Sequence, residues 1–308
     1  MSDNGKPAIP DHRIGEPAGL RPAGHRLNSR QLLQSTGTVG GWTLISRILG
    51  LVRDVVYARL FGATYVMDAF FVAFRIPNIF RRFFAEGAFS QAFVPVFAEY
   101  DQSRERQEVQ ELVDRAAGTL GAILLVIAAV GSIAAPLFVA LFAPGFIAEG
   151  GDGGAGADRY ELAVDMLRWT FPYLLFVSLA ALAGGILNTY HRFVAAAFSP
   201  VLLNVVLIGF AVWVAPHFAR PGMALAVGVF VAGILQLGCM LPSLARLRLL
   251  PRPRWGWPHP GVRKILKLMV PGLFGSSVAQ ISILLDTLIA SFLVTGGIGT
   301  GCTTPIAS

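Results

Sequence analysis

Residues 61–100 read FGATYVMDAFFVAFRIPNIFRRFFAEGAFSQAFVPVFAEY, and this stretch places Arg75, Arg81, Arg82 and Glu86 within one of the most apolar and aromatic parts of the chain. A charged side chain at the centre of a bilayer costs at least about 2.5 to 3.5 kcal/mol on insertion scales, so such residues usually face a bundle interior or a water-filled cavity. The stretch therefore predicts membrane helices that surround a polar interior.

The composition of the whole chain agrees with this interpretation. Of the 308 residues, 54% are hydrophobic and only 14% are charged, whereas soluble domains carry about 25% charged residues. Apolar runs of about 20 residues, the length that crosses a bilayer as a helix, alternate with short polar connections. The runs lack the alternation of a membrane β-barrel. The sequence predicts an all-α, polytopic membrane protein.

The expected organisation is a tail followed by seven membrane spans. Residues 1–36 are rich in Pro, Gly, Arg and Asn and contain no apolar core of a signal peptide, so we expect a disordered tail. Six spans form one lobe over residues 37–248, and a basic loop at 249–263 leads into the seventh span at 264–295, before a tail at 296–308. The expected spans cover residues 38–61, 66–98, 116–143, 161–188, 194–216, 222–245 and 264–295.

The charges of the connections predict the orientation of the spans. Basic residues concentrate in the N-terminal tail and in every second connection, whereas the connection at 143–160 carries three acids against one arginine. Because Lys and Arg are enriched in cytoplasmic loops, we expect the N-terminus in the cytoplasm and the end of the seventh span outside. This orientation and contact with membrane lipids account for the net charge of +7, so no nucleic-acid binding is expected.

The first two spans are unusually charged. Between Arg47 and Glu86 the chain holds six cations and three anions in 40 residues. Arg47 and Asp54 lie on nearly one helical stripe, and Arg82 and Glu86 are four residues apart, so partial pairing is expected in both cases. A guanidinium can hold a phosphate through two parallel hydrogen bonds. The pattern predicts a hydrated cationic cavity for a phosphorylated cargo with an apolar tail.

Less specific interpretations remain open for three of these residues. Arg47 could extend toward the cytoplasmic headgroups and Arg59 toward the outer ones. Asp68 could cap the second span.

Prolines predict interrupted helices in the second and seventh spans. Pro77 lies within RIPN and removes a backbone donor, so we expect it to act as a hinge in a broken or strongly bent helix. The sequence MVPGLFGSS, residues 269–277, suggests the same for the seventh span. Interrupted helices in transporters expose backbone groups to a cavity.

At these residues the sequence resembles the MurJ (MviN) family of lipid II flippases, within the multidrug/oligosaccharidyl-lipid/polysaccharide exporter superfamily. The resemblance covers approximately residues 37–295. It rests on SRILGLVRDVVYARLFGA (46–63), DAFFVAFRIPNIFRRFFAEGAFSQAFVPVFAEY (68–100), GGILNTYHRF (184–193), FSPVLLN (198–204) and VAQISILLDTLIASFL (278–293).

The resemblance implies a fold and a function. The family has fourteen helices in two lobes around a central cavity that opens alternately to the two membrane faces. This chain would supply the first six-helix lobe and a seventh helix. The implied activity is movement of lipid II, a disaccharide-pentapeptide on undecaprenyl diphosphate, from the cytoplasmic to the outer leaflet of the bacterial inner membrane.

The resemblance also implies roles for individual residues. Arg47 and Arg53 on the first helix and Arg81 on the second match the family's cavity arginines, which we expect to contact the diphosphate. Asp68 and Glu86 match acidic positions, to which we assign gating or charge pairing.

The sequence indicates no enzymatic chemistry and no cofactor. Cys239 and Cys302 are the two cysteines of the chain, too few for a disulfide framework or a four-ligand zinc site. No phosphate-binding loop of the G-x-x-x-x-G-K-[ST] type occurs, so we expect transport to be driven by the membrane potential or by a sodium or proton gradient. Asp286 falls where some relatives place a sodium ligand.

Other functions stay open. The same fold could export another lipid-linked glycan or a drug, and the chain could be a non-transporting scaffold for cell-wall synthesis proteins. An enzyme acting on polyprenyl phosphates would need paired carboxylates or histidines at the cytoplasmic face. The expected cytoplasmic connections supply cations instead.

The end of the chain departs from the family pattern. After SFLVTG the family continues into an eighth helix beginning near Trp-Met-Tyr-Tyr-Ala-Asp-Arg, whereas this chain reads GIGTGCTTPIAS. With suitable codons, a one-base shift before Gly301 turns residues 302–307 into Met-Tyr-Tyr-Ala-Asp-Arg. We therefore expect a frameshift that truncates a full-length flippase after its seventh helix.

Overall fold

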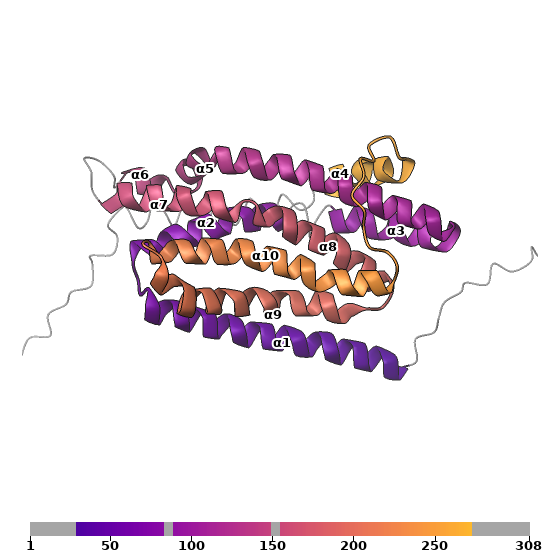
Figure 1. The fold of residues 1–308 in the computed structure, drawn as a ribbon, viewed down its shortest axis with the longest axis horizontal. Helices are drawn as coiled ribbons and strands as arrows, with labels where there is room; N and C mark the ends of the chain where they lie inside the picture. The colour runs from indigo at the N-terminus through magenta and orange to yellow at the C-terminus, as the bar shows by residue number, and fades with distance from the viewer. Residues whose placement is uncertain (1–28, 83–88, 149–154, 273–308) are drawn as a thin grey trace, which may run out of the picture.

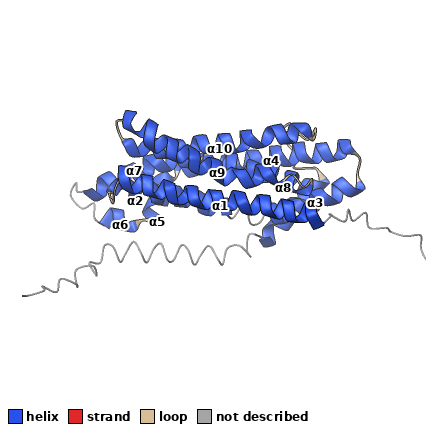
Figure 2. Cartoon of the chain, turned by 90° about the horizontal axis from the view of Figure 1, so that it is seen from below, coloured by secondary structure: helices blue, strands red, loops and turns tan. Residues whose placement is uncertain are grey.

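The structure is a computed structural model that describes residues 29–82, 89–148 and 155–272. Within these ranges the chain consists of helices joined by turns and loops, without a strand (Figure 2). Figure 1 shows an elongated bundle whose longer helices run along its longest axis. The predicted all-α class is confirmed.

The first hairpin consists of α1 (Ser29–Leu60) and α2 (Tyr65–Arg81). Helix α1 begins inside the segment that we expected to be a disordered tail, so that boundary was wrong. The turn between the helices contains Gly62 with φ of 62°, a left-handed conformation that glycine adopts without steric cost. Helix α1 packs on α9 (Phe193–Gly209) at one edge of the bundle (Figure 1).

Helix α2 continues through Pro77 to Arg81, so a break at this proline is wrong. The alternative of a bend, with Pro77 as a hinge, stays a prediction. Pro77 has no N–H to donate to the carbonyl oxygen of Ala73. The hydroxyl of the buried Thr170, on α7 (Ala155–Thr170), donates to that oxygen over 2.8 Å. The freed carbonyl is therefore satisfied from a neighbouring helix, and α2 need not open at the proline.

The remaining helices run back and forth between the two ends of the bundle. The elements are α3 (Ser90–Ser103), α4 (Arg106–Ile133), α5 (Ala135–Phe142), α6 (Pro144–Ala148), α8 (Tyr173–Thr189), a π-helical turn (Phe210–Val214) and a 3-10 turn (Ala215–His217) that extend α9, and α10 (Pro221–Arg246). Helix α4 starts well before the expected third span. Arg106 and Arg115, which we expected in a connection, therefore lie on this helix.

Four helical stretches in the described part are long and apolar enough to cross a membrane, namely Arg106–Ile133, Gly156–Thr189, Phe193–His217 and Pro221–Arg246. Helices α1 and α2, which contain the charged hairpin, are not among them. Many large apolar side chains on the bundle surface are exposed, as expected for a protein surrounded by lipid.

Two clusters of buried side chains hold the bundle together. One joins α3, α4, α8 and α10, with Phe93, Phe97 and Leu112 among its largest members. The other joins α2, α5, α7 and α10 around Phe70 and Phe171. The three cavities described below are bounded by helices that contribute side chains to these clusters.

One end of the bundle, here called the basic end, carries the α3–α4 turn and the loop that follows α10. The buried carboxylate of Asp114 on α4 accepts a hydrogen bond from the backbone N–H of Arg252 over 2.8 Å. Gly118 allows the backbone of this loop to lie against α4, because a β-carbon there would lie 2.2 Å from the carbonyl oxygen of Arg254. The loop is thus anchored on the bundle.

The seventh expected span is only partly described. The chain is helical from residue 260 to 272, so the end of the expected 249–263 loop already belongs to a helix. The rest of that span, with Asp286, lies outside the described residues.

Candidate functional site

A cavity of about 480 Å³, here called the Arg53 cavity, lies between α1, α2 and α5. Two guanidiniums line it, those of Arg53 and Arg75, together with the amide of Asn78. The other lining residues are apolar or aromatic and are Phe71, Val72, Phe74, Ile76 and Phe142. The cavity therefore combines two cations with a largely apolar wall.

The side chain of Arg53 is held in a defined position. Its Nε and Nη2 lie 3.0 and 2.8 Å from Oδ1 of Asp54, and Nη1 donates to Oδ1 of Asn204 over 3.1 Å. The guanidinium also lies 5.8 Å from the centre of the Tyr57 ring. Because the exposed fraction of the Arg53 side chain is 22%, its charge is only partly screened by solvent.

A second cavity of about 490 Å³, here called the amide cavity, lies between α2, α3, α8, α9 and α10. Its wall contains small side chains and one guanidinium, that of Arg81. The uncharged polar groups of the wall belong to Asn78, Ser90, Tyr173, Asn188, Ser199 and Gln236.

Asn78 connects the two cavities because it lines both of them. Its Oδ1 accepts a hydrogen bond from Nε of Arg81 over 2.9 Å. Arg75, Asn78 and Arg81 are spaced by three residues along α2, which places them on neighbouring positions of one helix face. Asn78 thus lies in the wall that contains Arg53 and Arg75 and also in the wall that contains Arg81.

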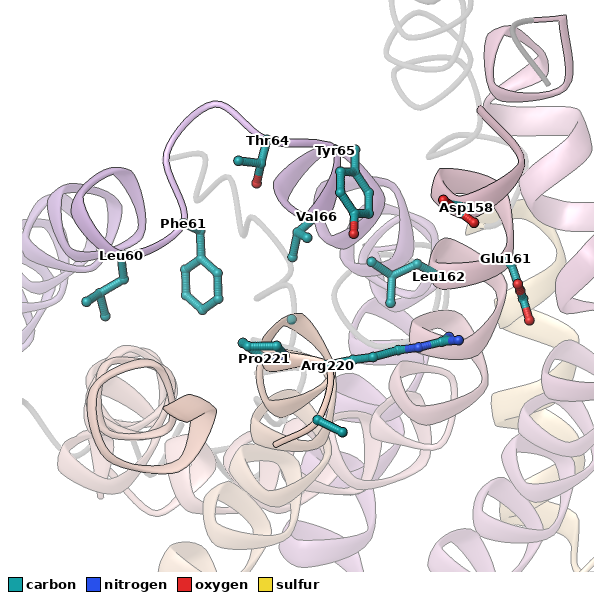
Figure 3. A pocket seen from close by; sticks show the side chains of 12 residues that line it. Leu60, Phe61, Thr64, Tyr65, Val66, Asp158, Glu161, Leu162, Arg220 and Pro221 are labelled. Atoms are coloured by element: carbon teal, nitrogen blue, oxygen red, sulfur yellow. The ribbon is translucent and has the colours of Figure 1, made fainter. Parts of the chain in front are cut away.

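A third cavity, of about 520 Å³, opens at the end of the bundle opposite the basic end. Figure 3 shows Phe61 of the first hairpin above Pro221 and Tyr65 next to Leu162 of α7, with the side chain of Arg220 extending below Leu162 toward the side of Glu161. Its wall mixes acids, one base and apolar side chains.

Near this third cavity, an ion pair connects α2 to α7. Oδ2 of Asp68 lies 3.8 Å from Nη2 of Arg159. Asp68 follows Thr64, the N-cap of α2, and this Asp68–Arg159 pair fits the predicted charge-pairing role better than a capping role.

The structure corrects one predicted pair and leaves others outside its description. Asp54 forms its ion pair with Arg53, the residue directly before it in the sequence, and not with Arg47. Arg47 is exposed on α1 and lines none of the three cavities. Glu86 falls outside the described residues, so its pairing with Arg82 stays a prediction.

Three residues were not assigned to the site from the sequence: Arg75 and Gln236, which line cavities, and Asn204, which binds Arg53. Arg75 was counted among the charges of the hairpin but given no role. Asn204 and Gln236 are isolated amides in apolar helices, and both are buried. Polar residues within membrane spans are costly and frequently functional, so the signal was present but was applied only to charged residues.

Comparisons with known proteins give a consistent result. A family model described as "Lipid II flippase MurJ" matches residues 57–300. The chain is 48% identical over 270 residues to the "Probable lipid II flippase MurJ" of Vibrio cholerae, which covers 88% of this chain and 51% of that protein. It is 45% identical over 271 residues to the "Lipid II flippase MurJ" of Burkholderia cenocepacia, which covers 87% of this chain and 51% of that protein.

A solved structure shares the fold. The structure titled "Lipid II flippase MurJ, inward closed conformation" matches with a TM-score of 0.66 and 26% identity, over 82% of this chain and 50% of that chain. The chain spans about half the length of the curated relatives it matches.

Proposed function

This chain belongs to the family of the lipid II flippase MurJ, and on this premise we propose that it forms the diphosphate-binding half of a flippase that moves lipid II to the outer leaflet of the bacterial inner membrane. Transport proceeds by alternating access, without enzymatic turnover of the cargo. The observation that carries the proposal is the Arg53 cavity, in which two guanidiniums meet a mostly apolar wall.

Charge and geometry of this cavity suit a diphosphate. A diphosphate offers several anionic oxygens, and guanidiniums bind such oxygens through paired hydrogen bonds. Asp54 neutralises part of the charge of Arg53, and no ion pair joins Arg75 to another of the described residues. Counted over the described residues, the cavity therefore keeps a net positive charge that an anionic ligand would balance.

Arg81 and Arg47 extend this binding site in two directions. Arg81 reaches the same ligand across Asn78, since both cavities share this amide. Arg47 lies six residues before Arg53, about 9 Å along the helix. We assign Arg47 to the first contact with the diphosphate, because its side chain is exposed on α1.

The pair between Asp68 and Arg159 is proposed as a gate at the end opposite the basic end. At 3.8 Å and with an exposed Asp68 side chain, the pair is weak enough to break during transport. With the basic end and the N-terminus in the cytoplasm, this gate faces the outer side. Coupling to the membrane potential or to a sodium or proton gradient, with Asp286 as a candidate sodium ligand, completes the proposal.

The test is lipid II translocation in bacterial cells depleted of their own flippase. This chain replaces the matching half of the Vibrio cholerae relative, and labelled lipid II is measured at the outer leaflet. We expect translocation with the unaltered chimera and its loss with Arg53→Ala. Arg59→Ala is the matched control, because Arg59 lies on the same helix, is exposed and lines none of the three cavities.

Three outcomes would reject the proposal or its parts. Translocation that survives Arg53→Ala, with the variant present in the membrane, contradicts the cavity assignment. Translocation of another lipid-linked glycan but not of lipid II favours the exporter alternative. Growth support without any translocation favours the scaffold alternative.

A further inference from the structure

The amide cavity contains a buried polar atom that no described residue satisfies. Gln236, on α10, is 3% exposed, and its Nε2 donates to the carbonyl oxygen of Ser199 over 2.9 Å. Its Oε1 has no hydrogen-bond donor among the described residues. A buried acceptor without a donor is destabilising. Because Gln236 is one of the residues that line the amide cavity, a ligand bound there would lie next to the side chain that lacks a donor.

The rest of the cavity is suited to an uncharged polar group. At about 490 Å³ it falls within the range of about 300 to 1,000 Å³ that is typical of ligand sites. One wall of the cavity is formed by small residues of α8, namely Ala180, Ala181 and Gly184, which leave space for a ligand. Hydroxyl and amide groups of Asn188 and Ser199 line other parts of the wall.

We propose that the amide cavity binds the uncharged, hydroxyl- and amide-bearing part of the lipid II headgroup, with Oε1 of Gln236 accepting a hydrogen bond from a sugar hydroxyl or an amide N–H. An ionised diphosphate cannot donate this hydrogen bond, because its oxygens are acceptors and Oε1 of Gln236 is an acceptor too. The inference rests on the proposed function, since lipid II is the ligand that it assigns to the cavity.

The two cavities divide the headgroup between them. Asn78 lines both cavities, and Nε of Arg81, which lines the amide cavity, donates a hydrogen bond to Oδ1 of Asn78. A diphosphate in the Arg53 cavity would therefore place the group attached to it next to the amide cavity. Recognition of the diphosphate and of the sugar or peptide portion then depends on different residues.

The experiment measures the affinity of the purified chain in lipid nanodiscs for two probes, lipid II and undecaprenyl diphosphate. Gln236→Met keeps the length of the side chain and removes its hydrogen bonds. We expect this variant to bind lipid II about fivefold more weakly, the effect of one lost hydrogen bond, and to bind undecaprenyl diphosphate unchanged. Gln91→Met, at an exposed position of α3 outside the cavity wall, is the matched control.

A second variant tests the cavity without removing a hydrogen bond. Ala181→Leu adds volume to the open wall, and we expect it to weaken lipid II binding by at least the same factor while the affinity for undecaprenyl diphosphate stays constant. If Gln236→Met does not fold, Ala181→Leu decides the question.

The outcomes separate this inference from the proposed function. Equal affinity of the unaltered chain for both probes, or unchanged lipid II binding by the two cavity variants, overturns the inference and leaves the diphosphate site intact. Failure of the unaltered chain to bind either probe overturns both.

Discussion

Asn204 connects Arg53 to the backbone of its own helix. Its Oδ1 accepts a hydrogen bond from Nη1 of Arg53 over 3.1 Å, and its Nδ2 donates to the carbonyl oxygen of Ser46 over 3.1 Å. Because Asn204 lies on α9 and is 7% exposed, one buried amide both joins α9 to α1 and sets the direction of the guanidinium.

Replacement of Asn204 by leucine should therefore affect stability and transport together. Asn204→Leu removes both hydrogen bonds and leaves Arg53 with Asp54 alone. We expect a loss of about 1 to 3 kcal/mol in the free energy of unfolding, measured by denaturation in detergent, and reduced translocation in the chimera. Asn204→Asp, which keeps the acceptor for Arg53, should retain more of both. A leucine variant as stable and active as the unaltered protein would show that the amide does not position Arg53.

The hydroxyl of Thr170 should be required for the stability of α2 around Pro77. Thr170→Val keeps the shape of the side chain but leaves the carbonyl oxygen of Ala73 without its donor. We expect a destabilisation of about 1 to 3 kcal/mol, whereas Thr170→Ser should be much closer to the unaltered protein. Equal stability of the valine and serine variants in detergent denaturation would contradict the role of this hydrogen bond.

The proposed gate makes a prediction about Asp68 and Arg159. Because the pair is partly exposed, Asp68→Asn should change the free energy of unfolding by less than about 1 kcal/mol yet slow translocation clearly. Exchange of the two charges, Asp68→Arg with Arg159→Asp, should recover part of the rate. Glu105→Gln, at an exposed position of the α3–α4 turn that lines none of the three cavities, serves as control. If the exchange is no better than either single reversal, charge pairing is not the function of Asp68.

Tyr190 at the basic end should respond to alkaline pH. Partial burial, and in second place the hydrogen bond from its hydroxyl to Asp101, raise the pKa of Tyr190 to about 12. An unperturbed phenol has a pKa of about 10. The folded state therefore favours the protonated phenol, so this contribution to stability is complete below pH about 10 and is lost as the pH rises through about 12. Absorbance titration of the protein and of Tyr190→Phe should differ by one phenol that ionises near pH 12, and a difference near pH 10 would contradict the assignment.

Much of the fold follows from local sequence properties. Long apolar runs indicate membrane helices because every backbone group must be satisfied within the bilayer. The arginines of the first hairpin indicated a cavity because their burial in lipid would be costly, and Arg53 and Arg81 do line cavities. Family motifs carried the same assignment.

The two mispredicted helix features have different causes, and one of them depends on a partner distant in the sequence. Pro77 does not interrupt α2 because Thr170, in a helix far along the chain, satisfies the carbonyl that the proline frees. The early start of α4 at Arg106 was missed because hydropathy locates the membrane-spanning part of a helix and not its polar extension.

The amides were missed for a different reason. Asn204 and Gln236 are neutral, so they add nothing to a charge pattern, and only their burial inside apolar helices distinguishes them. Whether such a residue binds a partner or a ligand depends on the three-dimensional arrangement of several helices.

The most direct test of the central claim is the affinity of the purified chain for undecaprenyl diphosphate, with undecaprenol as the probe that lacks the charge. We predict that the unaltered protein and Arg59→Ala bind the diphosphate and discriminate strongly against undecaprenol. The double variant Arg53→Ala/Arg81→Ala should bind the diphosphate at least about tenfold more weakly. Undiminished binding by a folded double variant would contradict the claim that these cavities hold the diphosphate.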